Sequence, residues 1–143
     1  MEILICRLCY QLNIQYVPSQ RKLPFCSKCS QTRFSSGEYS EKVFERVEQV
    51  FSQEGNQLNL TCCDIDDESA IAVATLLPYL TQLQELHLDD NQIGDSGATA
   101  IAYSIKDLTQ LQQLHLGNNE IGDTGTTAIV NSITNLTQLQ ELN

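Results

Sequence analysis

LTQLQELHLDDNQIGDSGATAIAYSIKD, from Leu80 to Asp107, is followed directly by LTQLQQLHLGNNEIGDTGTTAIVNSITN, from Leu108 to Asn135. The two segments have the same length and are identical at 18 positions. A fixed period of this length is typical of repeat proteins, in which each unit buries its apolar face only against its neighbours. Because stacked repeats present a long surface, the period indicates a binding function before any single residue does.

Each copy predicts a short strand followed by a helix. Leucines first alternate with polar residues, as in a strand that buries one face. Asn91 follows where the chain must turn away from the strand, and its amide can bond backbone groups that lack a sheet partner. Apolar residues then recur at helical spacing, and we expect Asp95 to be the N-cap. The second copy repeats the pattern, with Asn119 and Asp123 in the matching positions.

The pattern L-x-x-L-x-L-x-x-N-x-I-G-D-x-G-x-x-A-I resembles the ribonuclease-inhibitor type of leucine-rich repeat, and is similar to the repeats of NOD-like receptors and of the Ran GTPase-activating protein. One period earlier, a weaker copy places Cys63 where the asparagine is expected, a substitution that this family accepts. One period later, residues 136–143 restart the unit. The resemblance implies an α/β leucine-rich repeat solenoid with parallel strands on its concave face and helices on its convex face.

Two full copies, one weak copy and a partial copy are few for an array that needs about three repeats and a cap at each end. We therefore expect the chain to be a fragment of a longer array. Its 143 residues contain no apolar run long enough for a transmembrane helix and no secretory signal at the start. These features predict a cytoplasmic protein that does not enter a membrane.

The net charge of −10 is unevenly distributed along the chain. Residues 1–33 carry five basic side chains against one acidic one, whereas the rest of the chain is strongly acidic. This asymmetry predicts separate modules. We assign residues 1–33 to an N-terminal module, residues 34–54 to an amphipathic linker helix, and residues 55–143 to the leucine-rich repeats. The apolar stripe of the linker helix is expected to cap the first repeat.

Four cysteines in the N-terminal module have the spacing of a structural metal site. Cys6, Cys9, Cys26 and Cys29 form two C-x2-C turns, which residues 10–25 separate. Two such turns complete a tetrahedron of thiolates around Zn²⁺. The arrangement resembles a zinc ribbon, and a segment of about 30 residues needs such a metal to order it because its own core is too small.

Other chemistries use the same residue type. An iron site would be built from the same four ligands, so the choice between zinc and iron stays open. A redox dithiol is disfavoured because neither pair lies between a strand and a helix. Disulfides are disfavoured because no secretory signal precedes the module.

The candidate binding surface consists of polar residues that alternate with the buried leucines and point outward from the predicted sheet. Stacked by period, they are expected to form columns of neighbouring side chains on the concave face, with His87 next to His115. A two-histidine metal site is conceivable there, but a copied surface histidine is the simpler interpretation. The candidate protein-binding residues are Asn59, Thr61, Glu85, His87, Asp89, Gln113, His115 and Glu141.

Two functions fit these features. The first is a non-catalytic scaffold that binds a protein partner, one with a basic patch, through the acidic concave surface. The second is nucleic-acid binding by the basic N-terminal module, where nearby aromatic residues can stack on bases. An enzyme is disfavoured because the sequence shows no recognisable catalytic constellation and no phosphate-binding glycine loop.

The four-cysteine site yields a direct test. Elemental analysis of protein purified without added metal should find one Zn²⁺ per chain, because four thiolates hold zinc tightly at neutral pH. A chelator should then release four reactive thiols. Iron in place of zinc would correct the metal, and metal-free protein with freely reactive or disulfide-paired cysteines would contradict the site.

Overall fold

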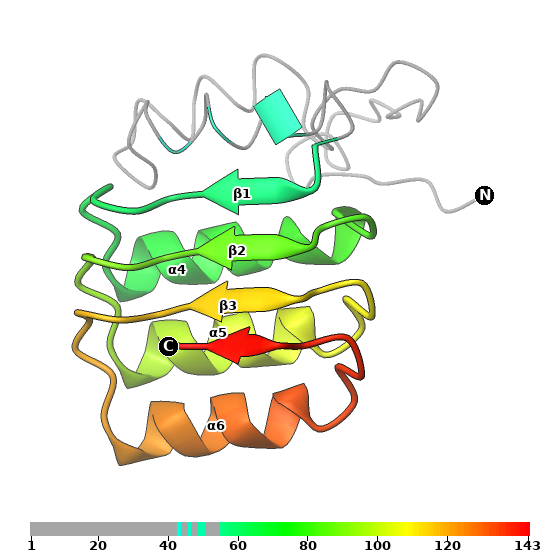
Figure 1. The fold of residues 1–143 in the computed structure, drawn as a ribbon. Helices are drawn as coiled ribbons and strands as arrows, with labels where there is room; N and C mark the ends of the chain where they lie inside the picture. The colour runs from blue at the N-terminus through cyan, green and yellow to red at the C-terminus, as the bar shows by residue number, and fades with distance from the viewer. Residues whose placement is uncertain (1–42, 44–45, 47–48, 51–54) are drawn as a thin grey trace, which may run out of the picture.

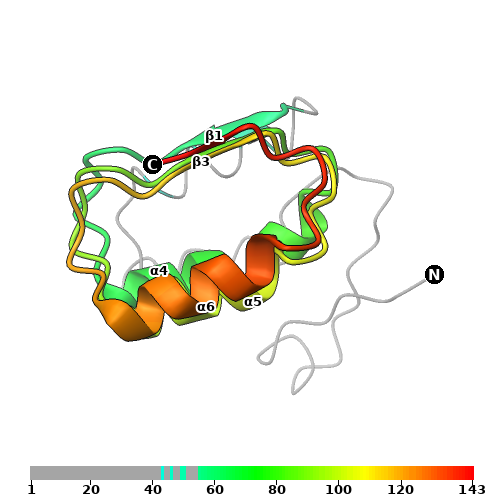
Figure 2. The ribbon, with the colours of Figure 1, turned by 60° about the horizontal axis from the view of Figure 1, so that its bottom comes forward.

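The computed structural model describes Val43, Arg46, residues 49–50 and residues 55–143. In residues 55–143, short strands alternate with helices (Figure 1). Their order is β1 (Gln57–Asn59), α4 (Asp67–Ala74), the 3-10 helix η2 (Leu77–Tyr79), β2 (Glu85–His87), α5 (Asp95–Ile105), β3 (Gln113–His115), α6 (Asp123–Ile133) and β4 (Glu141–Leu142). The strands form one layer and the helices a second layer, which lies below the strands in Figure 2. The alternation of strand and helix predicted for residues 55–143 is confirmed.

The strands build a parallel sheet in the order β1-β2-β3-β4. Each residue pairs with the one 28 positions further along, so Leu58 lies opposite Leu86 and Leu86 opposite Leu114. This register confirms the period predicted from the sequence. Viewed along the stack, β1 overlies β3 and the three helices overlie one another (Figure 2).

The space between the two layers is filled by aliphatic side chains from every repeat. Leu86, Leu114 and Ile101 are 0% exposed, which places strand leucines and helix isoleucines in one core. Each fully buried side chain of this size stabilises the fold by about 1.5–3 kcal/mol relative to an exposed one. The core is therefore continuous along the stack and is shared between neighbouring repeats.

Asn91 holds the turn between strand and helix by bonding the preceding repeat. The residue is 8% exposed. Its side-chain Oδ1 accepts hydrogen bonds from the backbone N–H groups of Cys63 and Ile65, both at 3.0 Å. Its Nδ2 donates to the carbonyls of Leu60, Leu88 and Asp89 at 2.9–3.0 Å. The amide thus satisfies buried backbone groups that the short strands leave unpaired, as predicted.

Asn119 repeats this arrangement one unit later. Its Oδ1 accepts from the backbone N–H of Ile93, and its Nδ2 donates to Leu88, Leu116 and Gly117 carbonyls. Both asparagines therefore reach back toward the repeat that precedes them in the chain.

The aspartates expected to be N-caps have a different role. Helix α5 begins at Asp95 itself, and Gly94 occupies the N-cap position without a side-chain bond. The Asp95 carboxylate instead accepts the backbone N–H groups of Gly122 and Gly125, at 2.9 and 2.7 Å, in the next repeat. The N-cap prediction for Asp95 is therefore wrong, and so is that for Asp123, because Gly122 is the N-cap of α6. The Asp95 carboxylate caps the helix that follows, since the open N–H groups of α6 lie beside it.

The same contact joins the first two repeats. Asp67 Oδ1 accepts from Gly94 and Gly97, both at 2.8 Å. A Cβ atom at Gly97 would come within 2.8 Å of this oxygen, so glycine is required for the close approach. Helix α4 differs because it has its own N-cap: Asp66 accepts from the backbone N–H of Ser69 at 2.8 Å, which lowers the pKa of the Asp66 carboxyl.

At the start of the stack, Cys63 replaces the turn asparagine, and an arginine supplies the missing donor. Arg46 Nη1 lies 2.7 Å from the Asn59 carbonyl, 3.3 Å from the Thr61 carbonyl and 3.3 Å from the sulfur of Cys63. In the next repeat, the equivalent carbonyl is that of Asp89, and it accepts a hydrogen bond from the side-chain amide of Asn91. The guanidinium therefore bonds the same type of carbonyl that an asparagine amide bonds elsewhere.

The helix predicted over residues 34–54 falls largely outside the described residues. Its described members, Val43, Arg46 and residues 49–50, are helical, and Val43 and Val50 are 1% and 7% exposed. Residues 1–33, with Cys6, Cys9, Cys26 and Cys29, lie outside the described part of the chain. In the part that is described, no helix has the length and apolar character needed to cross a bilayer.

Replacing Asn91 by alanine should strongly destabilise the protein. The change leaves buried backbone groups in two repeats without partners, and each unsatisfied group costs about 1–3 kcal/mol. We expect a loss of about 3 kcal/mol or more in the free energy of unfolding, measured by urea denaturation of the whole chain. Asn131→Ala, at an exposed position of α6, is the control and should change it by less than about 0.5 kcal/mol. Equal losses in both variants would contradict the role of Asn91.

Asp95 and Asp123 provide a matched pair for the contact between helices. Both begin a helix, but only Asp95 has the glycine N–H groups of a following repeat beside it in the described chain. Asp95→Ala should therefore cost about 1–3 kcal/mol more than Asp123→Ala in the same urea experiment. Equal costs would mean that the aspartates act only on their own helices.

Candidate functional site

The outward-pointing residues of the sheet form columns that run across the strands. Gln57 lies opposite Glu85, Glu85 opposite Gln113, and Gln113 opposite Glu141. A second column contains Asn59, His87 and His115 in register. Beyond the strand ends, Thr61, Asp89 and Gly117 follow at the same spacing, tied by backbone bonds such as Asp90 N–H to the Gly117 carbonyl. All eight residues predicted to bind a partner lie in these three columns.

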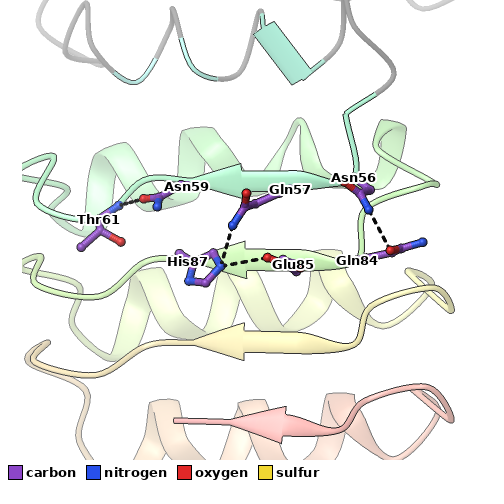
Figure 3. A network of polar contacts seen from close by, with 7 residues as sticks. All are labelled: Asn56, Gln57, Asn59, Thr61, Gln84, Glu85 and His87. Atoms are coloured by element: carbon purple, nitrogen blue, oxygen red, sulfur yellow. Dashed lines mark hydrogen bonds and ion pairs between the residues drawn. The ribbon is translucent and has the colours of Figure 1, made fainter.

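Neighbouring columns are linked by side-chain contacts (Figure 3). Gln57 Nε2 lies 3.2 Å from His87 Nε2, and the same histidine nitrogen is 3.5 Å from Glu85 Oε2. At the N-terminal ends of β1 and β2, Asn56 Nδ2 donates to Gln84 Oε1 at 2.8 Å. The contacts of Asn56 and Gln57 join the first repeat to the second, so the polar surface is ordered by its own contacts as well as by the backbone beneath it.

His87 and His115 stack face to face on adjacent strands. Their ring centroids are 4.6 Å apart and their planes differ by 5°. The adjacency predicted from the period is confirmed. Nε2 of His115 is buried and makes no hydrogen bond, and it is the one buried side-chain nitrogen or oxygen in the described residues without a partner.

Asp89 lies beside the two rings. Its Oδ1 accepts the backbone N–H of Gly117 at 3.1 Å, which fixes the carboxylate against the next repeat. One potential ligand atom from each of Asp89, His87 and His115 lies within 4.8 Å of the others. Side chains at this position of the neighbouring repeats are uncharged, so the acidic group is specific to the second repeat.

The electrostatic character of this part of the chain is one-sided. In residues 55–143 acidic side chains outnumber basic ones by twelve to one. The one cation in that range, Lys106, follows the last residue of α5 in the helical layer. The sheet face carries Glu85, Asp89 and Glu141 without a lysine or arginine from residues 55–143. A negative potential over this face follows from the sequence.

Sequence reasoning did not identify the role of Arg46 or the Asn56–Gln84 contact. Both contacts join groups that are distant in the sequence: Arg46 bonds a main-chain carbonyl 13 residues away, and Asn56 bonds a side chain 28 residues away. The 28-residue spacing of Asn56 and Gln84 was a usable signal, since it equals the repeat period. No sequence signal pointed to Arg46, because the first repeat lacks a preceding copy for comparison.

The predicted metal ligands and the nucleic-acid alternative both concern residues 1–33. These residues lie outside the described part of the chain, so both remain predictions. Cys62 and Cys63 belong to the first repeat: Cys63 is buried in the turn, and Cys62 adopts a positive φ of 53°, like Asp90 and Asn118 in the following repeats.

Comparison with known proteins agrees with the repeat geometry. Residues 81–127 match the family of leucine-rich repeats in two copies, and residues 56–74 match a second leucine-rich repeat family. No curated protein gives a significant match to the chain.

Among solved structures, this chain is similar to one described as Leiomodin-1 Actin-Binding Site 2. The two share 26% sequence identity with a TM-score of 0.61. The alignment covers 71% of this chain and 59% of the other, so this chain spans less than two thirds of the length of its structural neighbour.

Proposed function

We propose that this protein is a non-catalytic scaffold that binds a protein partner through the polar columns of the sheet face. The observation that carries the proposal is the in-register array of exposed and half-exposed polar side chains on β1 to β4. Leucine-rich repeats generally mediate contacts between proteins. We further assign the array to the ribonuclease-inhibitor type, a solenoid built from 28-residue units.

The sheet face suits recognition because its side chains are held in fixed positions. Parallel strands lie about 4.8 Å apart, so each column presents one side chain per repeat at a constant spacing. Leu58, Leu86 and Leu114, which lie between these side chains, are almost completely buried and anchor their strands to the core. A partner that binds here meets a surface that is already ordered, and it loses little free energy in ordering it.

The partner surface should be basic. Glu85, Asp89 and Glu141 are spread over β2, the end of that strand and β4, and residues 55–143 bring no cation to this face. Complementary charge speeds association and excludes acidic competitors. The chain should therefore select a protein patch rich in lysine or arginine.

The structural neighbour suggests one partner for direct testing, because that protein is described as an actin-binding site. Binding of filamentous actin by this chain would be one case of the proposed function. The N-terminal module, with its predicted four-cysteine zinc site, is proposed to complete the scaffold as a small stabilised end module.

A selection experiment tests the proposal even while the partner is unidentified. The whole chain is used to select binders from a random peptide library in the presence of a chelator, and filamentous actin is tested in parallel by co-sedimentation. Selected peptides should be enriched in lysine and arginine. The triple variant Glu85→Gln, Asp89→Asn, Glu141→Gln should bind them at least tenfold more weakly, since three contacts of about 0.5–1 kcal/mol are removed.

The control variant removes the same amount of charge elsewhere. It carries three substitutions at exposed positions outside the strands: Asp107→Asn, Glu120→Gln and Asp123→Asn. This variant should bind the selected peptides within about twofold of the parent chain. Peptides without basic residues, or equal losses in the two variants, would contradict binding through the sheet face.

A further inference from the structure

Three side chains with metal-binding groups converge on the sheet face at the second and third repeats. His87 and His115 come from paired positions of β2 and β3, and Asp89 lies just beyond the end of β2. One potential ligand atom from each lies within 4.8 Å of the other two. In the described residues this is the one group of histidine, cysteine and acidic side chains with such spacing.

The buried nitrogen of His115 is a second, independent observation. Its Nε2 is shielded from solvent and has no hydrogen-bond partner, although buried polar atoms in folded proteins are almost always paired. The stacked ring of His87 lies against this imidazole but offers it no donor or acceptor. An additional bound group at this position would satisfy the nitrogen.

We propose that His87, His115 and Asp89 form a binding site for a divalent transition metal ion, Zn²⁺ in the first instance. Two imidazoles and one carboxylate are ligands that zinc accepts with tetrahedral geometry, and water would occupy the fourth position. The two nitrogen donors favour zinc and its neighbours in the transition series over Mg²⁺ and Ca²⁺, which prefer oxygen donors.

Metal binding requires a small rearrangement of the two rings. A metal ion lies in the plane of each imidazole that binds it, whereas the rings are now parallel within 5°. A tilt of one ring about χ2 brings both lone pairs toward one point. The ligand atoms, now within 4.8 Å of one another, must also approach to about 3.3 Å, the separation in a tetrahedral zinc site with bonds of about 2.0 Å. We expect side-chain rotation to provide this approach, because the strands already hold the two histidines side by side.

Surrounding contacts prepare the ligands. The backbone N–H of Gly117 holds Asp89 Oδ1, which leaves the second carboxylate oxygen for the metal. Glu85 Oε2 lies 3.5 Å from His87 Nε2, so a carboxylate is in place to orient that ring. Partners of this kind fix the position of metal-binding side chains and strengthen the site.

The chain contains only two histidines, which makes a direct experiment possible. The whole chain is uniformly labelled with ¹⁵N, reduced, and loaded with one equivalent of Zn²⁺ for its cysteines. It is then titrated with ZnCl₂ at about pH 7.5, because protons compete with metal ions for their ligands at lower pH. The imidazole nitrogen resonances are followed by NMR. Zinc bound by cysteine thiolates has no imidazole ligand and is not detected through these resonances. Both imidazoles should shift together and saturate with one further equivalent. Desalting should reverse the shifts, because three partly exposed ligands release zinc more readily than four thiolates.

Two adjacent aspartates provide the matched variants. Asp89→Asn retains an acceptor for the Gly117 N–H but removes the charged ligand, and should weaken Zn²⁺ binding at least tenfold. Asp90→Asn removes the same charge one residue away and should stay within about twofold of the parent chain. Asparagine tolerates the positive φ of 55° at position 90. In His87→Gln, the His115 resonances should no longer respond at the same Zn²⁺ concentration.

Unchanged imidazole spectra, a response from one ring only, or equal effects of Asp89→Asn and Asp90→Asn would overturn the site. The outcome is independent of the proposed partner binding, because the peptide selection is performed in chelator. Metal binding without peptide binding, or the reverse, therefore identifies which of the two proposals fails.

Discussion

The structure depends on satisfying the backbone polar groups where each short strand turns toward its helix. Strands of two or three residues leave most of the turn without sheet partners, and these groups are buried by the next repeat. Asn91 and Asn119 resolve this by placing both an acceptor and a donor inside the turn. Because the amide must reach the preceding repeat, it also fixes the spacing and register of neighbouring repeats. The sheet follows from that register.

The polar columns are a consequence of the same constraint. Once Leu86 lies opposite Leu58 and Leu114, the residues on either side are aligned as well, whatever their chemistry. His87 therefore stacks on His115 without any need for attraction between the rings. A surface of this kind can vary in sequence from repeat to repeat while its geometry stays constant, which separates the function of the array from its stability.

The sequence predicted the period, the strand–helix alternation, the turn asparagines and the histidine pair, because each follows from a 28-residue pattern and its repetition along the chain. The role of Asp95 was not, since a carboxylate at the start of a helix is compatible with capping its own helix or the next one. The choice depends on the distance between α5 and α6, which Gly125 sets by lacking a side chain. Arg46 was also beyond sequence reasoning, because its partners are largely main-chain atoms with no residue-specific signal. At the candidate site, the sequence predicted the neighbours of His87 but not the unpaired nitrogen of His115.

The asparagines bond backward to the preceding repeat, whereas the aspartates bond forward to the following one. The junction between the two full repeats is therefore held by two contacts that run in opposite directions. Each repeat supplies the side chain of one contact and the backbone groups of the other. A duplicated 28-residue unit carries its own asparagine, aspartate and glycines, so it can be inserted between two others and leave no contact incomplete. The array can thus lengthen by whole repeats, and each added repeat widens the sheet face by one strand.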